Sequence, residues 1–211
     1  MLMAGTISQD QYSMVSEQEE KSDDILLQEI AAGNAEAFSI LVHRHSDRFY
    51  GLAWRLTSNN QEAEDVVQDA FLKLWNAPDA FDSSKGVKFT TWFYRVVSNV
   101  AIDRIRKRKR FWVTDDFDSH ASQTQGTEES LIDREQQFLL EQAIQRLPEK
   151  QRLALNLCFY EGVSNKEAAE IMGVGVKAIE SLLMRAKSKL KDMLVRDNII
   201  TVKELKNAKL G

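Results

Sequence analysis

Residues 89–110 read FTTWFYRVVSNVAIDRIRKRKR, and this stretch decides the fold of the first half of the chain. Its apolar side chains recur every three or four residues, which is the period of one face of an α-helix. The stretch runs from aromatic to strongly basic, with six basic residues in its last seven. Aromatic rings offer flat faces on which unstacked bases can stack, and clustered Arg and Lys neutralise phosphates. We predict a helix with one nucleic-acid-facing side and a buried stripe formed by Phe93, Val97, Val100, Ala101 and Ile105.

Three further helices are predicted upstream of this stretch. The first begins at Asp23, an acidic residue that suits a helix start, and ends at Gly33–Asn34. The second carries one continuous apolar stripe over Phe38–Leu56, and Thr57–Asn60 breaks the pattern and offers a cap. The third covers Gln61–Trp75, and its apolar face consists of Ala63, Val66, Val67, Ala70, Phe71 and Leu74.

The segment 76–88 is predicted to be a loop, because it contains the turn-forming residues Pro78 and Gly86. Residues 23–110 are therefore expected to form one compact four-helix domain. The preceding residues 1–22 are rich in Gln, Ser and Glu, a composition typical of a disordered extension.

Bulk composition narrows the class of protein. The hydrophobic content of 43% is enough for real cores, and only two prolines and nine glycines argue against a loop-rich β architecture. The net charge of −4 does not indicate a binding partner, but the charged residues are unevenly distributed along the chain. Between Lys85 and Arg110 there are nine basic residues against one acidic residue, whereas Thr114 to Glu135 holds seven acidic residues against one basic. Such segregation predicts a local site for a polyanion, although a solvated charged face is the alternative.

The sequence excludes several classes of protein. The single cysteine, Cys158, provides neither a disulfide framework nor a Cys-based metal site, and we expect it to pack as a small hydrophobe. The first 21 residues lack the basic start and apolar stretch of a signal peptide, and no apolar run is long enough to span a bilayer. We therefore expect a cytoplasmic protein with no membrane insertion and no cofactor.

The second half is predicted to be a separate helical domain. Residues 111–131 are rich in Asp, Ser, Gln and Thr and are predicted to be a flexible acidic linker. Helical periodicity resumes after it and stops at Pro148, which can begin the next helix at its first turn. The second domain then covers 132–195 and leaves 196–211 as a tail, with helices expected at about 149–160, 165–172 and 176–194. The whole chain is predicted to be all-α: two small helical domains joined by the linker.

The second domain contains the pattern of a helix-turn-helix. Ser164 and Glu167 form a capping box, and Gly173 stands where a sharp turn needs positive φ. Small and apolar residues at fixed offsets then hold two helices together, although an ordinary helical hairpin is the alternative. The positions expected to face a DNA groove are Lys177, Ala178, Ser181 and Arg185, with Lys166 and Lys187 nearer phosphates.

Glu180 on the same helix is open to three interpretations. It could accept a hydrogen bond from the amino group of cytosine, pair with Lys187, or point at water. Whichever holds, a helix-turn-helix holds closed duplex, and the aromatic–basic helix suits opened strands. The combination predicts promoter recognition and melting.

Three stretches resemble the extracytoplasmic-function (ECF) sigma factors of bacterial RNA polymerase, in the sigma-70 family. The first is Asp65–Phe71, DVVQDAF, which is similar to the family's polymerase-binding motif. The second is Phe89–Asn99 with Asp103–Arg104, which resembles its promoter-melting helix. The third resembles its region-four helix-turn-helix and comprises Leu147–Arg152, Glu161–Ser164 and Arg185–Lys187.

The resemblance implies three sets of binding residues. The set for core RNA polymerase is Asp65, Val66, Gln68, Asp69, Phe71 and Leu72. The set for the minus-ten element, including its melted non-template strand, is Lys85, Lys88, Trp92, Arg95, Asn99, Arg104 and Arg106. The set for the duplex minus-thirty-five element is Lys166, Lys177, Ala178, Ser181, Arg185 and Lys187. Of the aromatic residues at 92–94, Phe93 is expected in the core, with a neighbour half exposed. The family also implies an anti-sigma factor as a partner and a role in stress response.

Two other classes of function fit the sequence less well. A stand-alone helix-turn-helix regulator would need a dimerisation or sensing region, and none is left in the sequence. An enzyme could use His43, His45 and Asp47 as metal ligands, but residues two apart on a helix point to different sides. His45 falls on an apolar stripe, so we expect a core histidine and no catalytic activity.

Overall fold

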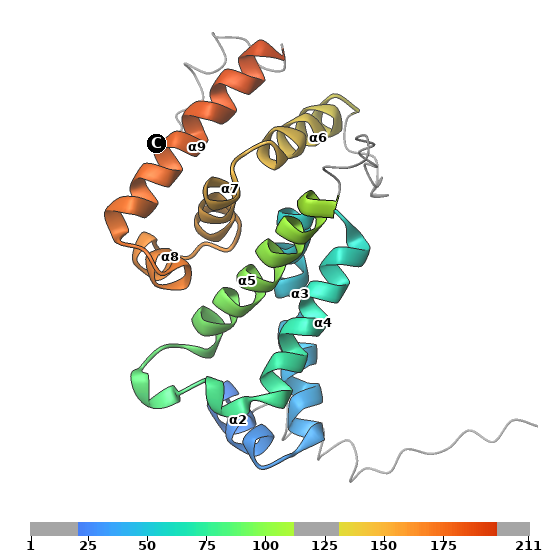
Figure 1. Ribbon diagram of the computed structural model, residues 1–211, viewed down its shortest axis with the longest axis vertical. Coiled ribbons are helices and arrows are strands. Elements are labelled where there is room, and N and C mark those ends of the chain that lie inside the picture. The colour runs from blue at the N-terminus through green and yellow to red at the C-terminus, as the bar shows by residue number, and fades with distance from the viewer. Residues whose placement is uncertain (1–20, 112–130, 198–211) are drawn as a thin grey trace, which may run out of the picture.

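The computed structural model of the protein describes residues 21–111 and 131–197. All regular structure within these ranges is helical, which confirms the predicted class, and the helices gather in two units (Figure 1). Across the same ranges no helix combines the length and apolar character that a bilayer crossing requires. The predicted extension, linker and tail lie almost wholly outside the described residues.

The first unit contains α2 (Asp23–Ala31), α3 (Ala35–Thr57), α4 (Asn60–Asn76) and α5 (Phe89–Phe111). Polar side chains fix where three of these helices begin, because they accept hydrogen bonds from backbone N–H groups that would otherwise lack a partner. These caps are Ser22 for α2, Asn34 for α3 and Asn59 for α4. The predicted break before the third helix is confirmed, and Asn59 is the residue that makes it.

An aromatic cluster sets how the first unit packs. Phe93 is fully buried, and its ring centroid lies 4.7 Å from those of both Phe49 and Phe71. The predicted buried stripe of α5 is confirmed, since all five of its members lie in the core. Between α4 and α5 the predicted loop contains two short 3-10 turns, Pro78–Ala80 and Ser83–Lys85. The rotation of α5 about its own axis is thus fixed, and this determines which of its residues face outward.

The second unit contains α6 (Leu131–Gln145), α7 (Glu149–Leu155), a π turn over Asn156–Tyr160, α8 (Asn165–Met172) and α9 (Val176–Arg196). Two details differ from prediction. Pro148 is the cap before α7 and not part of its first turn. The helix expected over 149–160 widens at Asn156, whose buried side-chain amide donates to the Arg152 carbonyl at 2.9 Å, a local bond that competes with the regular helical ladder.

The two units pack against each other through apolar side chains. One core cluster contains residues of both units, including Leu153, Leu157, Ala168 and Ile179 from the second. α8 lies against α5, and α7 lies against α3 (Figure 1). A second, smaller core lies inside the second unit, between α6, α7 and α9. Hydrophobic periodicity predicts which face of each helix is buried but not that these faces meet across the units.

Candidate nucleic-acid interface

α5 presents several of the residues predicted to bind the minus-ten element. Arg95 and Asn99 are exposed and lie four residues apart, on one face of the helix. Trp92 is half-buried, and its ring lies 5.5 Å from Phe81 and 6.1 Å from Phe89. These distances show that the indole is anchored by neighbouring rings while part of it stays accessible. The predictions of a core Phe93 and a half-exposed neighbour are confirmed, and that neighbour is Trp92.

The loop before α5 carries two exposed lysines, Lys85 and Lys88. Asp82 organises it by accepting hydrogen bonds from the Ser84 hydroxyl at 2.6 Å and the Ser84 backbone N–H at 3.0 Å. These bonds, with that from Lys85, lower the pKa of Asp82. Lys85 Nζ pairs with Asp82 Oδ2 at 3.2 Å, and both side chains are exposed to solvent. Such a contact is weak enough for a phosphate to replace.

Tyr94, by contrast, is buried under the second unit. Its hydroxyl donates to Glu161 Oε2 at 2.6 Å, and Arg55 donates to the other carboxylate oxygen of Glu161. The Glu161 side chain is only 7% exposed. Burial and the bond to Glu161 raise the pKa of Tyr94 well above its ordinary value. Of the two neighbours of Phe93, therefore, only Trp92 is open to solvent.

A second polar contact between the units involves the basic end of α5. Glu149, at the start of α7, accepts from Lys109 Nζ at 3.1 Å and from Arg106 Nε at 3.2 Å. Burial opposes ionisation here, but the two cations prevail and lower the pKa of Glu149. Arg106, one of the predicted DNA-binding residues, is thus occupied by a carboxylate in this arrangement.

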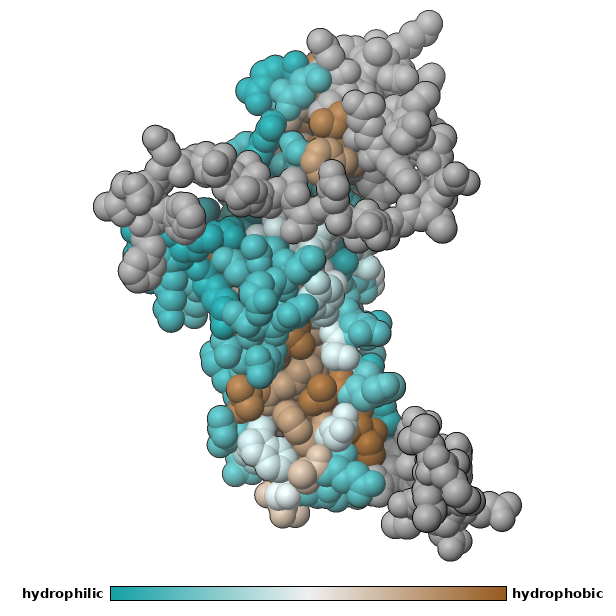
Figure 2. All heavy atoms as spheres, turned by 90° about the vertical axis from the view of Figure 1, so that its right-hand side faces the viewer, coloured by the Kyte–Doolittle hydropathy of each residue, from teal (hydrophilic) through white to brown (hydrophobic). Residues whose placement is uncertain are grey.

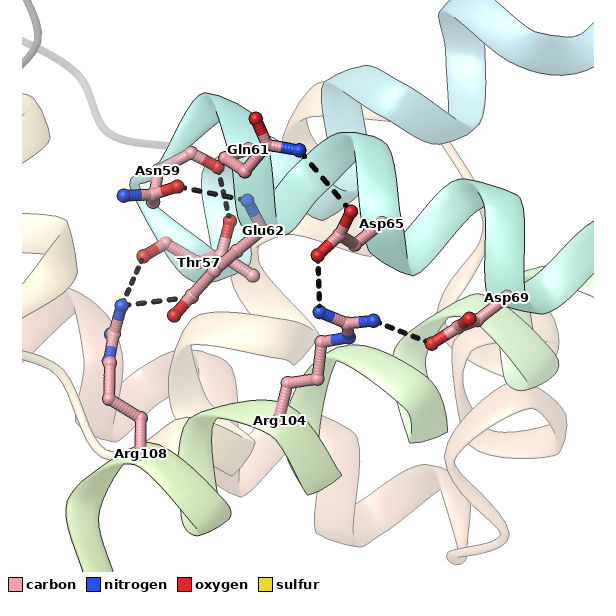
Figure 3. Close-up of polar contacts among 8 residues, drawn as sticks. All are labelled: Thr57, Asn59, Gln61, Glu62, Asp65, Asp69, Arg104 and Arg108. Atoms are coloured by element: carbon pink, nitrogen blue, oxygen red, sulfur yellow. Dashed lines mark hydrogen bonds and ion pairs between the residues drawn. The ribbon is translucent and has the colours of Figure 1, made fainter. Parts of the chain in front are cut away.

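α4 and α5 are joined by two arginines of α5, as Figure 3 shows. Arg104 Nη1 lies 2.8 Å from Asp65 Oδ2, and its Nη2 lies 2.7 Å from Asp69 Oδ2. The hydrogen bond to Asp69 is the largest cause of a raised pKa for Arg104. One turn along, Arg108 pairs with Glu62 at 2.9 Å. Arg104 was predicted to bind DNA, and the structure turns its guanidinium toward α4 instead.

The rest of the predicted polymerase-binding set splits into exposed and buried residues. Gln68 is exposed and Leu72 is 46% exposed, so both can contact a partner. Val66 and Phe71 were also predicted to contact polymerase, and this needs correction. Both are buried in the helical core and can only support α4 from within. Figure 2 faces the side of the molecule along which α4 runs and shows hydrophobic residues gathered there within a hydrophilic surround. An exposed apolar patch with a polar rim is typical of a protein-binding surface.

The helix-turn-helix is formed as predicted. Ser164 and Glu167 make both halves of the capping box, and the bonds from Ser164 lower the pKa of Glu167. Gly173 ends α8 with φ of 63°, in the left-handed region that favours glycine. The Arg95 guanidinium lies beside this turn, since a Cβ placed on Gly173 would come within 3.9 Å of it. The turn therefore lies close to the face of α5 that is predicted to bind the minus-ten element.

The first half of α9 is open to solvent. Lys177, Ala178 and Arg185 are exposed, as is Lys166 on α8. Ser181 is half-buried, and its hydroxyl donates to the Lys177 carbonyl at 2.9 Å. Lys187 Nζ lies 5.0 Å from the centre of the Phe159 ring, a cation–π contact that occupies its ammonium group. Glu180 is exposed and makes no side-chain hydrogen bond or ion pair within the described residues, which fits the interpretation that it points at water.

Sequence reasoning missed the carboxylates that join the units. Glu161 meets a residue 106 positions away and Glu149 one 40 positions away, so no local spacing links them. Glu161 stands in the quoted stretch Glu161–Ser164, but nothing about an isolated glutamate predicts burial.

His45 behaves as a core histidine. It is 7% exposed, lies 5.5 Å from the Phe89 ring, and its Nε2 lies 2.9 Å from Asp23 Oδ2. Burial lowers its pKa, although Asp23 opposes the shift. His43, in contrast, is exposed, so the two histidines face different surroundings. The prediction of a satisfied core residue is confirmed.

Comparison with known proteins accounts for both units. The family model for sigma-70 region 2 matches residues 41–111, and that for sigma-70 region 4 matches residues 137–190. The sigma factor NccH of Alcaligenes xylosoxydans is 32% identical over 177 residues, which cover 82% of this chain and 94% of NccH. The ECF sigma factor SigW of Bacillus subtilis is 29% identical over 181 residues, 80% of this chain and 94% of SigW. The chain belongs to the ECF sigma factors of the sigma-70 family.

A solved structure agrees with this assignment. The complex of the sigma factor RpoE with the anti-sigma factor NepR from Bartonella quintana superimposes with a TM-score of 0.61 at 27% identity, over 74% of this chain and 96% of RpoE. As a sigma factor the protein is a transcription-initiation factor that directs RNA polymerase to promoters. The region-2 match also accounts for the half of the chain that a stand-alone helix-turn-helix regulator would leave unexplained.

Proposed function

We propose that three surfaces of this sigma factor divide the work of initiation. Residues 23–110 act as region two and residues 132–195 as region four. In region two, the outer face of α4, made of Asp65, Gln68, Asp69 and Leu72, binds core RNA polymerase. Two carboxylates beside an exposed leucine suit a basic, amphipathic helical partner. Val66 and Phe71 serve this surface only by holding α4 in place.

The minus-ten element is captured on α5 and the loop before it. Trp92 offers a ring face already fixed by its aromatic neighbours, so stacking an unpaired base against it costs little further ordering. Arg95 and Asn99 follow along the same helix, and Lys85 and Lys88 stand at its start. A flipped base must recover a few kcal/mol of lost stacking. This surface supplies both stacking and phosphate contacts for that purpose.

The minus-thirty-five element is read by α9. Its exposed first half carries Lys177, Ala178 and Arg185, while Lys166 reaches phosphates from α8. Ser181 keeps only its acceptor capacity, because its proton is already given to the helix backbone. Lys187 contacts DNA only if it leaves the Phe159 ring. Reading duplex therefore depends on fewer side chains than the sequence predicted.

The two units have to separate before both elements can be bound. α8 contacts α5 and α9 packs on α8, so the reading helix lies about two helix diameters, roughly 20–24 Å, from α5. The two promoter elements lie about 25 base pairs apart, which is about 85 Å of duplex. No side-chain movement covers that difference. The packed arrangement is therefore the unbound state of the sigma factor.

An anti-sigma factor is proposed as the inhibitory partner. The related RpoE is solved in complex with the anti-sigma factor NepR. A partner that stabilises the packed arrangement would keep the two DNA-reading surfaces together and so prevent initiation. Affinity purification of the chain from resting and stressed cells tests this: a third protein should accompany it at rest and leave under stress. Recovery of polymerase alone in both states would contradict it.

The observation that carries the whole proposal is one chain that exposes both an aromatic–basic helix and a helix-turn-helix. The test is transcription in vitro with core polymerase and a library of genomic fragments, followed by mapping of start sites. Specific starts should appear only when the chain is added. Gel shift without polymerase should show weak binding to the same promoters, whereas tight unaided binding would indicate a stand-alone regulator.

A further inference from the structure

Arg104 joins the DNA-facing helix of region two to its polymerase-facing helix. Its guanidinium donates from Nη1 to Asp65 Oδ2 at 2.8 Å and from Nη2 to Asp69 Oδ2 at 2.7 Å (Figure 3). Asp65 and Asp69 lie one turn apart on α4, so a single planar group bridges successive turns of that helix. The three side chains together carry a net charge of −1.

The bridge leaves the outer oxygens of both carboxylates available. Asp65 Oδ1 receives only a long contact of 3.4 Å from Gln61, and within the described part of the chain nothing donates to Asp69 Oδ1. Both aspartates stay partly exposed. A rigid guanidinium fork fixes the position and orientation of the two groups it binds. A basic partner would therefore meet two carboxylates already held at a set spacing.

A simple role in holding α5 to α4 does not distinguish Arg104 from its neighbour. Arg108 also reaches from α5 to α4, where it pairs with Glu62 at 2.9 Å and meets the Thr57 carbonyl at 3.5 Å. Of these two arginines, only Arg104 contacts Asp65 and Asp69. Arg108 is thus a natural control for any effect of the helix contact itself.

We propose that Arg104 is a positioning residue for core polymerase, which presets Asp65 and Asp69 as one acidic pair for a basic side chain of the partner. The inference rests on the proposed role of the α4 face. It moves Arg104 from the minus-ten surface to the polymerase surface. Because Arg104 belongs to α5, it also links the proposed melting helix to the proposed docking surface on α4.

The proposal and plain electrostatics predict opposite signs. Removing a cation changes the charge of the cluster from −1 to −2, and charge alone would then strengthen attraction to a basic partner. Competition between Arg104 and the partner for the same carboxylates would also give tighter binding once Arg104 is removed. Positioning predicts weaker binding, because two side chains must then be ordered on docking, which corresponds to a loss of about tenfold in affinity.

The experiment measures the affinity of the labelled full-length chain for core polymerase by fluorescence anisotropy, without DNA. Arg104→Gln should bind about tenfold more weakly and Arg104→Lys should recover part of the loss, since an ammonium keeps the charge but not the fork. The matched control Arg108→Gln removes the same charge from the same helix and should bind nearly as wild type. Urea unfolding of all three variants checks that each folds.

Three further variants separate failure of the inference from failure of the proposed function. Asp69→Asn should weaken polymerase binding, and adding Arg104→Gln to it should cost little more, because the pair to be positioned no longer exists. If Asp69→Asn and Asp65→Asn both bind as wild type, the α4 face is not the docking surface. The positioning role alone is wrong if both aspartate variants weaken binding but Arg104→Gln tightens it. It is also wrong if Arg104→Gln loses no more affinity for polymerase than Arg108→Gln does.

Discussion

Replacing Glu161 by glutamine should open the packed arrangement of the two units. The carboxylate accepts from Arg55 and Tyr94 across the interface and is 7% exposed. In the open form both donors can bond to water instead, so the change penalises only the packed state. A hydrogen bond to a charged group contributes about 1 kcal/mol more than a neutral one, and two such bonds give about 2 kcal/mol. That corresponds to a shift of about 30-fold in the ratio of open to packed molecules.

The assay is energy transfer between one dye on α3 and one on α9, with the radius of gyration from X-ray scattering as a second measure. Glu161→Gln should lower the transfer efficiency and raise the radius of gyration. Glu170→Gln makes the same charge change at an exposed position of α8 and should leave both unchanged. Because replacing every member of a buried polar cluster by apolar residues can be neutral, Arg55→Met with Glu161→Leu and Tyr94→Phe should restore packing. Unaltered transfer in Glu161→Gln would refute the view that this contact holds the units together.

The remaining predictions concern DNA and stability. Trp92→Ala and Arg95→Ala should impair strand opening, seen as permanganate reactivity at the minus-ten element, more than recruitment of the holoenzyme to closed promoter. Lys177→Ala should reduce the slope of log affinity against log salt by about one for promoters that depend on the upstream element. Gly173→Ala should cost about 1–2 kcal/mol in urea unfolding, because its φ of 63° disfavours a side chain. Since burial lowers the pKa of His45, the unfolded chain binds its proton more readily; the free energy of unfolding should fall as pH drops below about 6.5, and His45→Gln should flatten that fall.

Local features of the fold were predictable because they depend on neighbours in sequence. The spacing of apolar residues predicted the buried stripe of α5, and the hydroxyl–carboxylate spacing of Ser164 and Glu167 predicted the start of α8. Gly173 predicted the turn, since few residues tolerate its backbone conformation. Each of these inferences uses residues within one or two helical turns of each other, where geometry leaves little freedom.

Side-chain roles at the candidate site were less predictable, because a motif does not distinguish a supporting residue from a contacting one. The resemblance predicts one set of binding residues from Asp65 to Leu72, yet the helix turns Val66 and Phe71 inward and leaves Gln68 and Leu72 outside. Helical period alone would have separated them, since Val66 and Phe71 also belong to the predicted apolar face. Tyr94 could not be resolved in this way, because its burial depends on Glu161 in the other unit.

A count of basic residues overstates the number of cations that the packed chain can offer to DNA. Five of the nine basic residues between Lys85 and Arg110 are paired with carboxylates. Two of those five, Arg106 and Lys109, pair with Glu149 of the other unit and are released when the units separate. Separation therefore frees Arg106 and Lys109 from Glu149 and raises the unpaired positive charge of α5. A chain that packs again whenever polymerase leaves it would bind promoter DNA weakly alone without any change in α5 itself.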